Sequence, residues 1–205
     1  MNYRTANKND ACFLAPLIFS SAAVTLAATF DVNDELSSLN FLHSNLLNCD
    51  GQFGYGNHWV AEIDKQVAGC VSAWHSDLSD SFHQATFNNL TSFYGIAHAF
   101  SVLQASQALH DCIPKPKKHE LCIGHFAVLA KYQRQGVATN LLKFAQQKAI
   151  DCGKSALCLD VESTNSQAID FYLGRGFIQE CESGISQRMR TLGIGSHRHL
   201  SKKLV

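Results

Sequence analysis

Hydrophobic positions along this chain repeat with two different periods, and the clearest change between them lies in its second half. The largely apolar run Leu121 to Val128 follows the charged residue Glu120 and predicts a buried strand. After the polar turn at 133–136, apolar residues recur at the spacing of one helix face: Val137, Leu141, Leu142, Ala145 and Ala149. The pattern therefore predicts a strand that is followed by an amphipathic helix.

The rest of the pattern predicts an α/β protein. Strands are expected at 2–6, 59–63, 66–74, 121–128, 156–161, 178–181 and 197–204, and helical segments at 11–30, 31–47 and 78–110. Asp64 and Lys65 are expected to join two strands in a hairpin, and Asp10 to cap the segment at 11–30. The length of 205 residues suits one domain, 1–205.

The turn at 133–136 is a candidate phosphate site. Backbone N–H groups at the start of a helix have no partner within the helix, and the helix dipole favours an anion there. Gly136 allows close approach of the backbone, and Arg134 adds a positive charge. The Gly-x-x-x-x-Gly-Lys-Ser/Thr string of nucleotide hydrolases does not occur, and the two Gly-x-Gly strings, at 54–56 and 193–195, do not lie between a strand and a helix.

Residues 121–177 carry two motifs in the order and spacing of one known family. Gln133-Arg134-Gln135-Gly136-Val137-Ala138 matches Arg/Gln-x-x-Gly-x-Gly/Ala, and the second motif comprises Asn165, Ala168, Phe171-Tyr172 and Gly176-Phe177. This segment resembles the core of the GCN5-related N-acetyltransferases, the GNAT superfamily. The resemblance implies a mixed, mostly antiparallel sheet flanked by helices, with residues 77–118 as a helical insertion between strands three and four.

The resemblance also implies acetyl-CoA as the cosubstrate and assigns its contacts. The pantetheine arm would lie between strands four and five, and the backbone N–H of Val128 would bind the thioester oxygen. Asn165 would contact the cofactor from the next helix. The complete set of implied cofactor-binding residues is Phe126, Ala127, Val128, Gln133, Arg134, Gln135, Gly136, Val137, Ala138, Thr139 and Asn165.

Proton transfer has one clear candidate and one open question. Tyr172 stands at the family position for the acid that protonates the leaving thiolate, although an aromatic residue there also suits core packing. Members of the family often carry a basic Glu or His at positions matching Cys122 and Gly124, neither of which is a good base.

By strand alternation Glu120 shares the face of Cys122 and Gly124, so it is the candidate base, acting through a water; a solvated strand-end charge is the alternative. Glu162 is the second candidate, and His125 is expected on the opposite face. A dedicated base is not required, since a water chain can remove the proton.

Composition restricts the expected partners, metals and cellular setting of the protein. Lys+Arg and Asp+Glu both number 17, and this neutral balance argues against nucleic acid as a main partner. None of the eight cysteines forms a Cys-x-x-Cys pair, so no metal is expected, and a reducing cytoplasm is the expected setting. Residues 11–30 carry no charge, yet their Pro, Ser and Thr residues favour a buried helix over a membrane span.

Taken together, these observations predict an N-acetyltransferase that modifies a primary amine, most simply that of a small molecule. Dimers are common in the family, so the resemblance makes a homodimer one expectation by analogy alone, and the sequence does not fix the oligomeric state. The alternatives are a protein N-terminal or lysine acetyltransferase and a catalytically silent CoA-binding or regulatory module. The absence of a family base on strand four favours the silent module, whereas the two intact motifs favour an enzyme.

Overall fold

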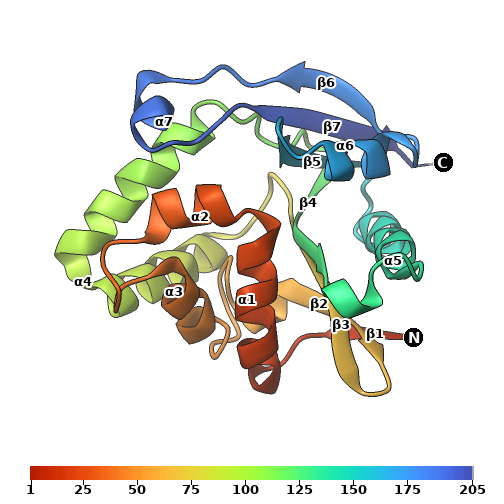
Figure 1. Ribbon diagram of the computed structural model, residues 1–205, viewed down its shortest axis with the longest axis horizontal. Helices are drawn as coiled ribbons and strands as arrows, with labels where there is room; N and C mark the ends of the chain where they lie inside the picture. Colours follow the sequence, from red (N-terminus) through yellow and green to blue (C-terminus); the bar gives the residue numbers. More distant parts are fainter. Residues whose placement is uncertain (205) are drawn as a thin grey trace.

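A seven-stranded sheet runs through the protein in the order β1-β2-β3-β4-β5-β7-β6, as seen in the computed structural model, which describes residues 1–204 (Figure 1). Neighbouring strands are antiparallel except for β4 and β5, which are parallel. The predicted mixed, mostly antiparallel sheet is therefore confirmed. The strands are β1 Asn2–Thr5, β2 His58–Ile63, β3 Gln66–Trp74, β4 Glu120–Val128, β5 Ala156–Glu162, β6 Ile178–Glu182 and β7 His197–Lys203.

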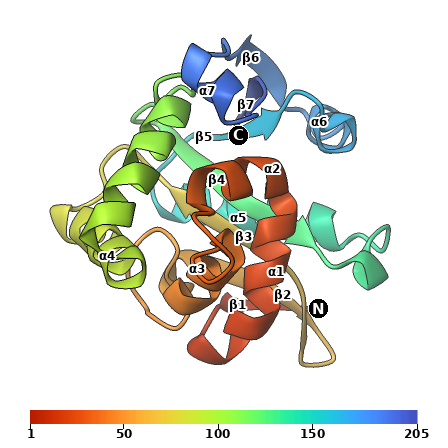
Figure 2. The same ribbon diagram turned by 60° about the vertical axis from the view of Figure 1, so that its left-hand side comes forward.

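Helices cover both faces of this sheet. One buried cluster joins α1, α2, α3 and α4 to Val60 and Cys70 of the sheet, and the second joins α5 and α6 to Ile123 and Leu159 on the other face. Figure 2 shows α1 to α3 in front of the sheet and α5 behind it. The helices are α1 Ala11–Ser21, α2 Ala23–Phe30, α3 Ser38–Asn45, α4 Asp80–His110, α5 Val137–Asp151, α6 Ser166–Leu173 and α7 Gln187–Thr191.

The predicted hairpin and the predicted amphipathic helix are both confirmed. Asp64 and Lys65 join β2 to β3 with left-handed φ angles of 50° and 62°, the backbone that a two-residue hairpin turn with the strand's own twist requires. In α5, all five residues of the predicted apolar stripe are buried: Val137, Leu141, Leu142, Ala145 and Ala149.

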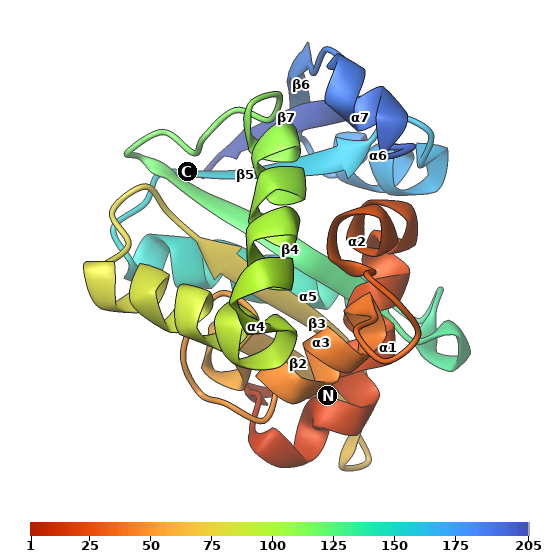
Figure 3. The same ribbon diagram turned by 90° about the vertical axis from the view of Figure 1, so that its left-hand side faces the viewer.

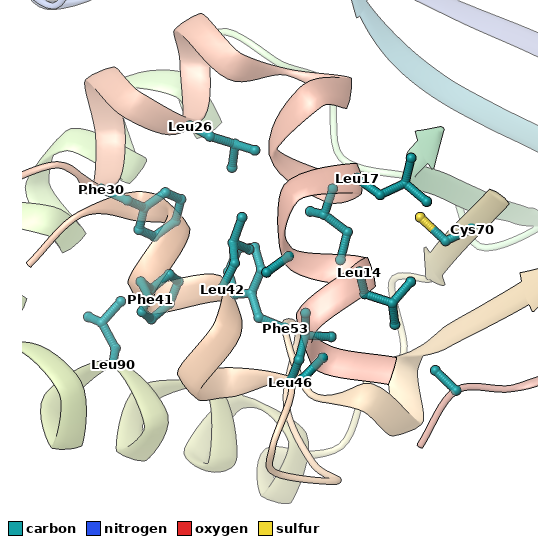
Figure 4. Packing of buried hydrophobic residues seen from close by; sticks show 14 of the residues in the cluster. Leu14, Leu17, Leu26, Phe30, Phe41, Leu42, Leu46, Phe53, Cys70 and Leu90 are labelled. Atoms are coloured by element: carbon teal, nitrogen blue, oxygen red, sulfur yellow. The ribbon is translucent and has the colours of Figure 1, made fainter. Parts of the chain in front are cut away.

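The N-terminal helical layer differs from the expectation. The segment 11–30 forms two helices, because the backbone leaves the helical region at Ala22, and of 31–47 only α3 is helical. Figure 4 shows Leu14, Leu26 and Phe41 from α1, α2 and α3 packed together around one apolar core. Within residues 1–204 no single helix is long and apolar enough to cross a membrane; Lys8–Ser21 and Ala23–Phe30 reach that length only as a pair bent by 104°.

The insertion at 77–118 consists mainly of α4, between β3 and β4 as predicted. Gly95 divides α4, since its φ of 71° and ψ of 163° lie outside the helical region, and Figure 3 shows the two halves running in different directions. The first half packs near α3, and the second reaches α7, where Arg188 donates a hydrogen bond to Gln104 at 3.1 Å. Four large apolar residues of α4 are exposed: Phe87, Ile96, Phe100 and Leu103.

Asp10 does not cap α1 with its side chain as expected. Asn7 begins a short 3-10 turn before α1, and Asp10 Oδ2 accepts the Asn7 N–H at 2.8 Å. The same carboxylate accepts two hydrogen bonds from Arg4, at 2.7 and 2.9 Å. Burial acts to raise the pKa of Asp10, but the bonds from Arg4 and Asn7 outweigh it and leave the pKa below its ordinary value.

We expect Leu141→Ala to lower the free energy of unfolding by about 2–5 kcal/mol, because Leu141 is 0% exposed in the core under α5 and its removal leaves a cavity. Leu47→Ala is the matched control, since Leu47 is 50% exposed. Urea titration of both variants measures the difference. Equal losses would contradict the assignment of this face of α5 to the core.

Asp10→Asn should lower stability by about 1–3 kcal/mol at neutral pH, where the native carboxylate is charged and bonded to Arg4. Because the pKa of Asp10 is lower in the folded protein than in the unfolded chain, its charged carboxylate stabilises the fold above about pH 4. This stabilisation is lost as the pH falls through the folded-state pKa. Denaturation between pH 2 and pH 7 should therefore show the two proteins converge in acid. Asp151→Asn, at an exposed pair with Lys148, should follow wild type throughout.

Candidate active site

The parallel strands β4 and β5 separate shortly after they begin. They pair at only three positions, of which Cys122 and Cys158 are the last. Beyond these residues β4 continues to Val128 and β5 to Glu162, and the facing edges of the two strands have no partner strand within residues 1–204. The result is a V-shaped opening, closed at Cys122 and open at Val128, where the resemblance places the pantetheine arm.

The backbone of Val128 is directed into the V. Leu129 N–H donates to Ala68 O of β3 at 2.9 Å, so the preceding residue, by strand alternation, turns its N–H and C=O towards β5. Gln133 Nε2 donates to Val128 O at 3.1 Å. The Val128 N–H, expected to bind the thioester oxygen, thus lies on the edge that has no strand partner.

A β-bulge at His125 changes which side chains reach each face. The β3–β4 register slips between Cys70 and Ser72, and His125 has a left-handed φ of 48°. As a consequence, Phe126 joins Ile123 on the face covered by α5, and His125 turns to the face covered by α1. The expectation that His125 lies opposite to Cys122 and Gly124 is therefore wrong, because one extra residue reverses the alternation of the strand.

Side chains hold the bulge in place. His58 Nδ1 donates to Gly54 O at 2.8 Å, and this leaves His58 Nε2 to accept from His125 Nδ1 at 2.9 Å. The His125 ring also stacks on Phe53, and Cys70 Sγ donates to His125 O at 3.2 Å. Burial lowers the pKa of His58 to about 4, and burial with the neighbouring His58 lowers that of His125 to about 3, so both rings are neutral at physiological pH.

The turn between β4 and α5 presents a row of backbone donors. Arg134 and Gly136 have left-handed φ angles of 59° and 81°, and Gly136 is the N-cap of α5 without a side-chain cap. Within residues 1–204, the N–H groups from Arg134 to Thr139 have no hydrogen-bond acceptor. Six consecutive free donors at a helix N-terminus form an anion-binding arrangement.

The backbone N–H groups of this turn are free, whereas most of its side chains either form hydrogen bonds within the protein or are buried. Gln133 bonds to Val128 O, and Gln135 Nε2 donates to Lys131 O at 2.8 Å, so both amides support the loop. Val137 is buried under α5, and its contribution to an anion site is its N–H alone. Arg134 is exposed and free to approach a phosphate.

Arg175 is a site residue that the motif analysis did not single out. Its guanidinium donates to Thr139 Oγ1 at 2.7 Å, donates to Phe171 O at 2.9 Å and lies 3.8 Å over the Phe171 ring. A positive charge is thereby held beside the first turn of α5. Arg175 stands between Gly174 and Gly176, within the second motif. That motif is defined by its glycine and aromatic residues, so it did not mark the arginine.

Tyr172 lies in an aromatic cluster between α6 and β4. Its ring centroid is 5.9 Å from that of Phe126 on β4 and 5.3 Å from that of Phe177. Burial raises the pKa of Tyr172, and its hydroxyl has no hydrogen-bond partner among residues 1–204. Asn165, from the same motif, N-caps α6 by accepting Ala168 N–H at 3.1 Å.

The candidate carboxylates lie at opposite ends of the V. Glu120 is buried at the closed end, where its Oε2 accepts Lys117 N–H at 2.7 Å. Glu162 is at the open end of β5, and Thr25 of α2 donates to its Oε1 at 2.7 Å. The two acids thus have different surroundings, and only Glu162 borders the helices that cover the open V.

Trp74 occupies the space where members of the family often carry a base. A Cβ atom added to Gly124 would lie 2.5 Å from Cη2 of Trp74, so any side chain at this position would displace the indole. Cys122, at the other family position, is buried directly opposite Trp74. The missing Glu or His is therefore replaced by packed apolar and sulfur groups.

Comparisons with known proteins agree with this geometry. The model of the Acetyltransferase (GNAT) family matches residues 28–177. N-acetyltransferase 8B of Rattus norvegicus is 25% identical over 139 residues, which are 68% of this chain and 60% of that protein. The chain thus spans about 60% of the length of this curated relative.

Solved structures share the fold at lower identity. An N-acetyltransferase from Staphylococcus aureus Mu50 is 17% identical with a TM-score of 0.67, covering 98% of this chain and 100% of that one. A protein from Salmonella typhimurium solved with its cofactor acetyl-CoA is 16% identical with a TM-score of 0.56, covering 100% and 94%. With the family model spanning most of its length, the chain belongs to the acetyltransferase (GNAT) family.

Proposed function

We propose that this protein transfers an acetyl group from acetyl-CoA to a primary amine by direct attack in a ternary complex. The observation that carries the proposal is the V between β4 and β5, which opens beside the row of free N–H groups from Arg134 to Thr139. A thioester carrier with a pyrophosphate fits this combination of an extended slot and an anion site. Membership of the family supports the same reaction.

The proposed cofactor contacts follow from the anion-binding turn at residues 134–139 and from the slot between β4 and β5. The pyrophosphate binds the N–H groups of residues 134–139, with Arg134 adding charge and Arg175 positioning Thr139. The pantetheine amides pair with the free edge of Phe126, Ala127 and Val128 as an added strand would. Asn165 borders the adenine-nucleotide side from α6.

The chemistry needs charge stabilisation and two proton transfers. As the amine nitrogen attacks the thioester carbon, Val128 N–H stabilises the oxygen on which negative charge develops. The carbon–sulfur bond then breaks, and Tyr172 donates its hydroxyl proton to the departing thiolate. A free hydroxyl beside Phe126 supports this role, because nothing in the protein competes for its proton.

The ammonium of the acceptor must lose a proton before it attacks. Glu162 is our first candidate for receiving it, because this carboxylate lies at the open end of the V next to α2. Glu120, which the sequence made the first candidate, becomes the second because it is buried at the closed end, from which it would act through a water. Water alone is sufficient if the amine binds in its neutral form.

The acceptor is proposed to be a small-molecule amine. The neutral overall charge fits a small amine better than a strongly charged macromolecular substrate, and α1, α2 and α4 cover the face of the V where an acceptor would enter. Acetylation of a protein N-terminus or lysine is the competing proposal. All eight cysteines are free thiols, which supports a reducing, cytoplasmic setting.

Gly136→Asp should weaken acetyl-CoA binding at least tenfold, because it places a carboxylate among the donors that hold the pyrophosphate. Gly153→Asp is the matched control: both glycines have left-handed φ and no close neighbours, so both variants carry similar backbone strain. Calorimetric titration with acetyl-CoA compares them. Equal affinities would remove the turn from the cofactor site.

Tyr172→Phe should lower kcat about 100-fold while acetyl-CoA affinity stays nearly constant, because only the acidic hydroxyl is lost. Tyr132→Phe removes an exposed hydroxyl that bonds to Gln66 and should leave kcat unchanged. Thiol release with a panel of amines measures both variants. Absence of turnover in the wild type with every small amine and peptide, despite acetyl-CoA binding, would favour the silent module.

A further inference from the structure

Three side chains of metal-binding type converge at the closed end of the V. Glu120 of β4, Cys158 of β5 and His199 of β7 bring their ligand atoms within 4.8 Å of one another. All three are buried, with exposed fractions of 1%, 0% and 3%. They come from three adjacent strands and point to the same face of the sheet, so the sheet itself holds their spacing.

Two of these side chains are oriented by further hydrogen bonds. His199 Nδ1 donates to Asp160 Oδ1 at 2.8 Å, which leaves Nε2 as the nitrogen available to an ion. A histidine that binds a metal commonly donates its other ring N–H to a carboxylate in this way. Glu120 Oε2 accepts Lys117 N–H, and Lys117 Nζ and His119 Nε2 lie 3.4 and 3.9 Å from Oε1.

Cys122 is a fourth candidate ligand beside this group of three. It is buried directly opposite Cys158 in the β4–β5 pairing. Because side chains on a strand alternate between faces, Cys122 shares the face of Glu120. Two sulfur atoms, one imidazole nitrogen and one carboxylate oxygen make a donor set that favours Zn²⁺ among common cellular ions.

We propose that Glu120, Cys122, Cys158 and His199 bind one Zn²⁺ ion in a closed, tetrahedral site. The ligand atoms of Glu120, Cys158 and His199 lie within 4.8 Å of one another, and zinc–ligand distances of about 2.0–2.3 Å require them and the Cys122 sulfur to move closer together when the ion binds. On binding, the two thiols lose their protons to solvent and become thiolates. The ion then offsets two of the three negative charges of its ligands, and the nearby Lys117 ammonium offsets the remaining one.

The site has a structural rather than a catalytic character. Its four protein ligands leave no position for substrate, and its location links β4, β5 and β7 where the V closes. The zinc site does not depend on acetyl transfer, but it affects one proposed role in that reaction. A Glu120 carboxylate bound to zinc is not free to accept the proton of the acceptor, so Glu120 is then no longer a candidate base.

The first test uses the wild-type protein, unfolded under reducing conditions and refolded with Co²⁺ or with no metal. A tetrahedral cobalt–thiolate site gives intense visible bands and a thiolate-to-cobalt charge-transfer band in the near ultraviolet. We expect both, with about one ion per chain by elemental analysis of the zinc-refolded protein. A spectrum without thiolate-to-cobalt bands would overturn the proposal even if no variant folds.

The second test compares variants by competition with a chromogenic zinc chelator. Cys158→Ala and His199→Gln should lose zinc to the chelator at least tenfold more readily than wild type, and Asp160→Asn about 10- to 100-fold more readily. Cys181→Ala removes an exposed thiol on β6 and should match wild type. Zinc retained equally by Cys158→Ala and Cys181→Ala would place the ion elsewhere and overturn the assignment.

Discussion

The early separation of β4 and β5 is the constraint on which the rest of the structure depends. Backbone donors and acceptors in a protein interior need partners, and an unpaired edge between two central strands is costly unless a ligand or water pairs with it. The edges beyond Cys122 and Cys158 are of this kind. The bulge at His125, the turn before α5 and the aromatic cluster on α6 are all arranged around that opening.

Because of its bulge, β4 presents different side chains to the helices on its two faces. On one face, Phe126 packs with Tyr172 beneath α6. On the other face, His125 is held by His58 under the N-terminal helices. A regular strand would have placed the histidine on the face covered by α5 and the phenylalanine on the face covered by α1, so one extra residue decides which side chain each face receives.

The sequence predicted the elements that depend on local patterns. The stripe of α5, the hairpin at Asp64 and Lys65 and the glycine turn before α5 each follow from periodicity or turn chemistry within a few residues. The bulge could not be predicted, because a left-handed φ at a histidine has no compositional mark. The break between α1 and α2 at Ala22 was not predicted either, because the uncharged run 11–30 predicts one helical segment.

Contacts between residues far apart in the sequence could not be predicted either. Arg175 reaches Thr139 across 36 positions, and His199 reaches Asp160 across 39, so neither pairing leaves a spacing that could be recognised in the chain. The expectation of no metal relied on the lack of Cys-x-x-Cys pairs. Ligands that come singly from neighbouring strands fall outside any such short motif.

The packing of Trp74 against Gly124 gives this protein a natural optical probe. The chain contains two tryptophans, and the other, Trp59, lies on β2 near Phe144 beneath α5. The Trp74 indole is in contact with β4 just before the bulge, so its emission should respond when the free edge of that strand gains a partner. Occupancy of the slot could then be followed by intrinsic fluorescence, without any label and on the time scale of mixing.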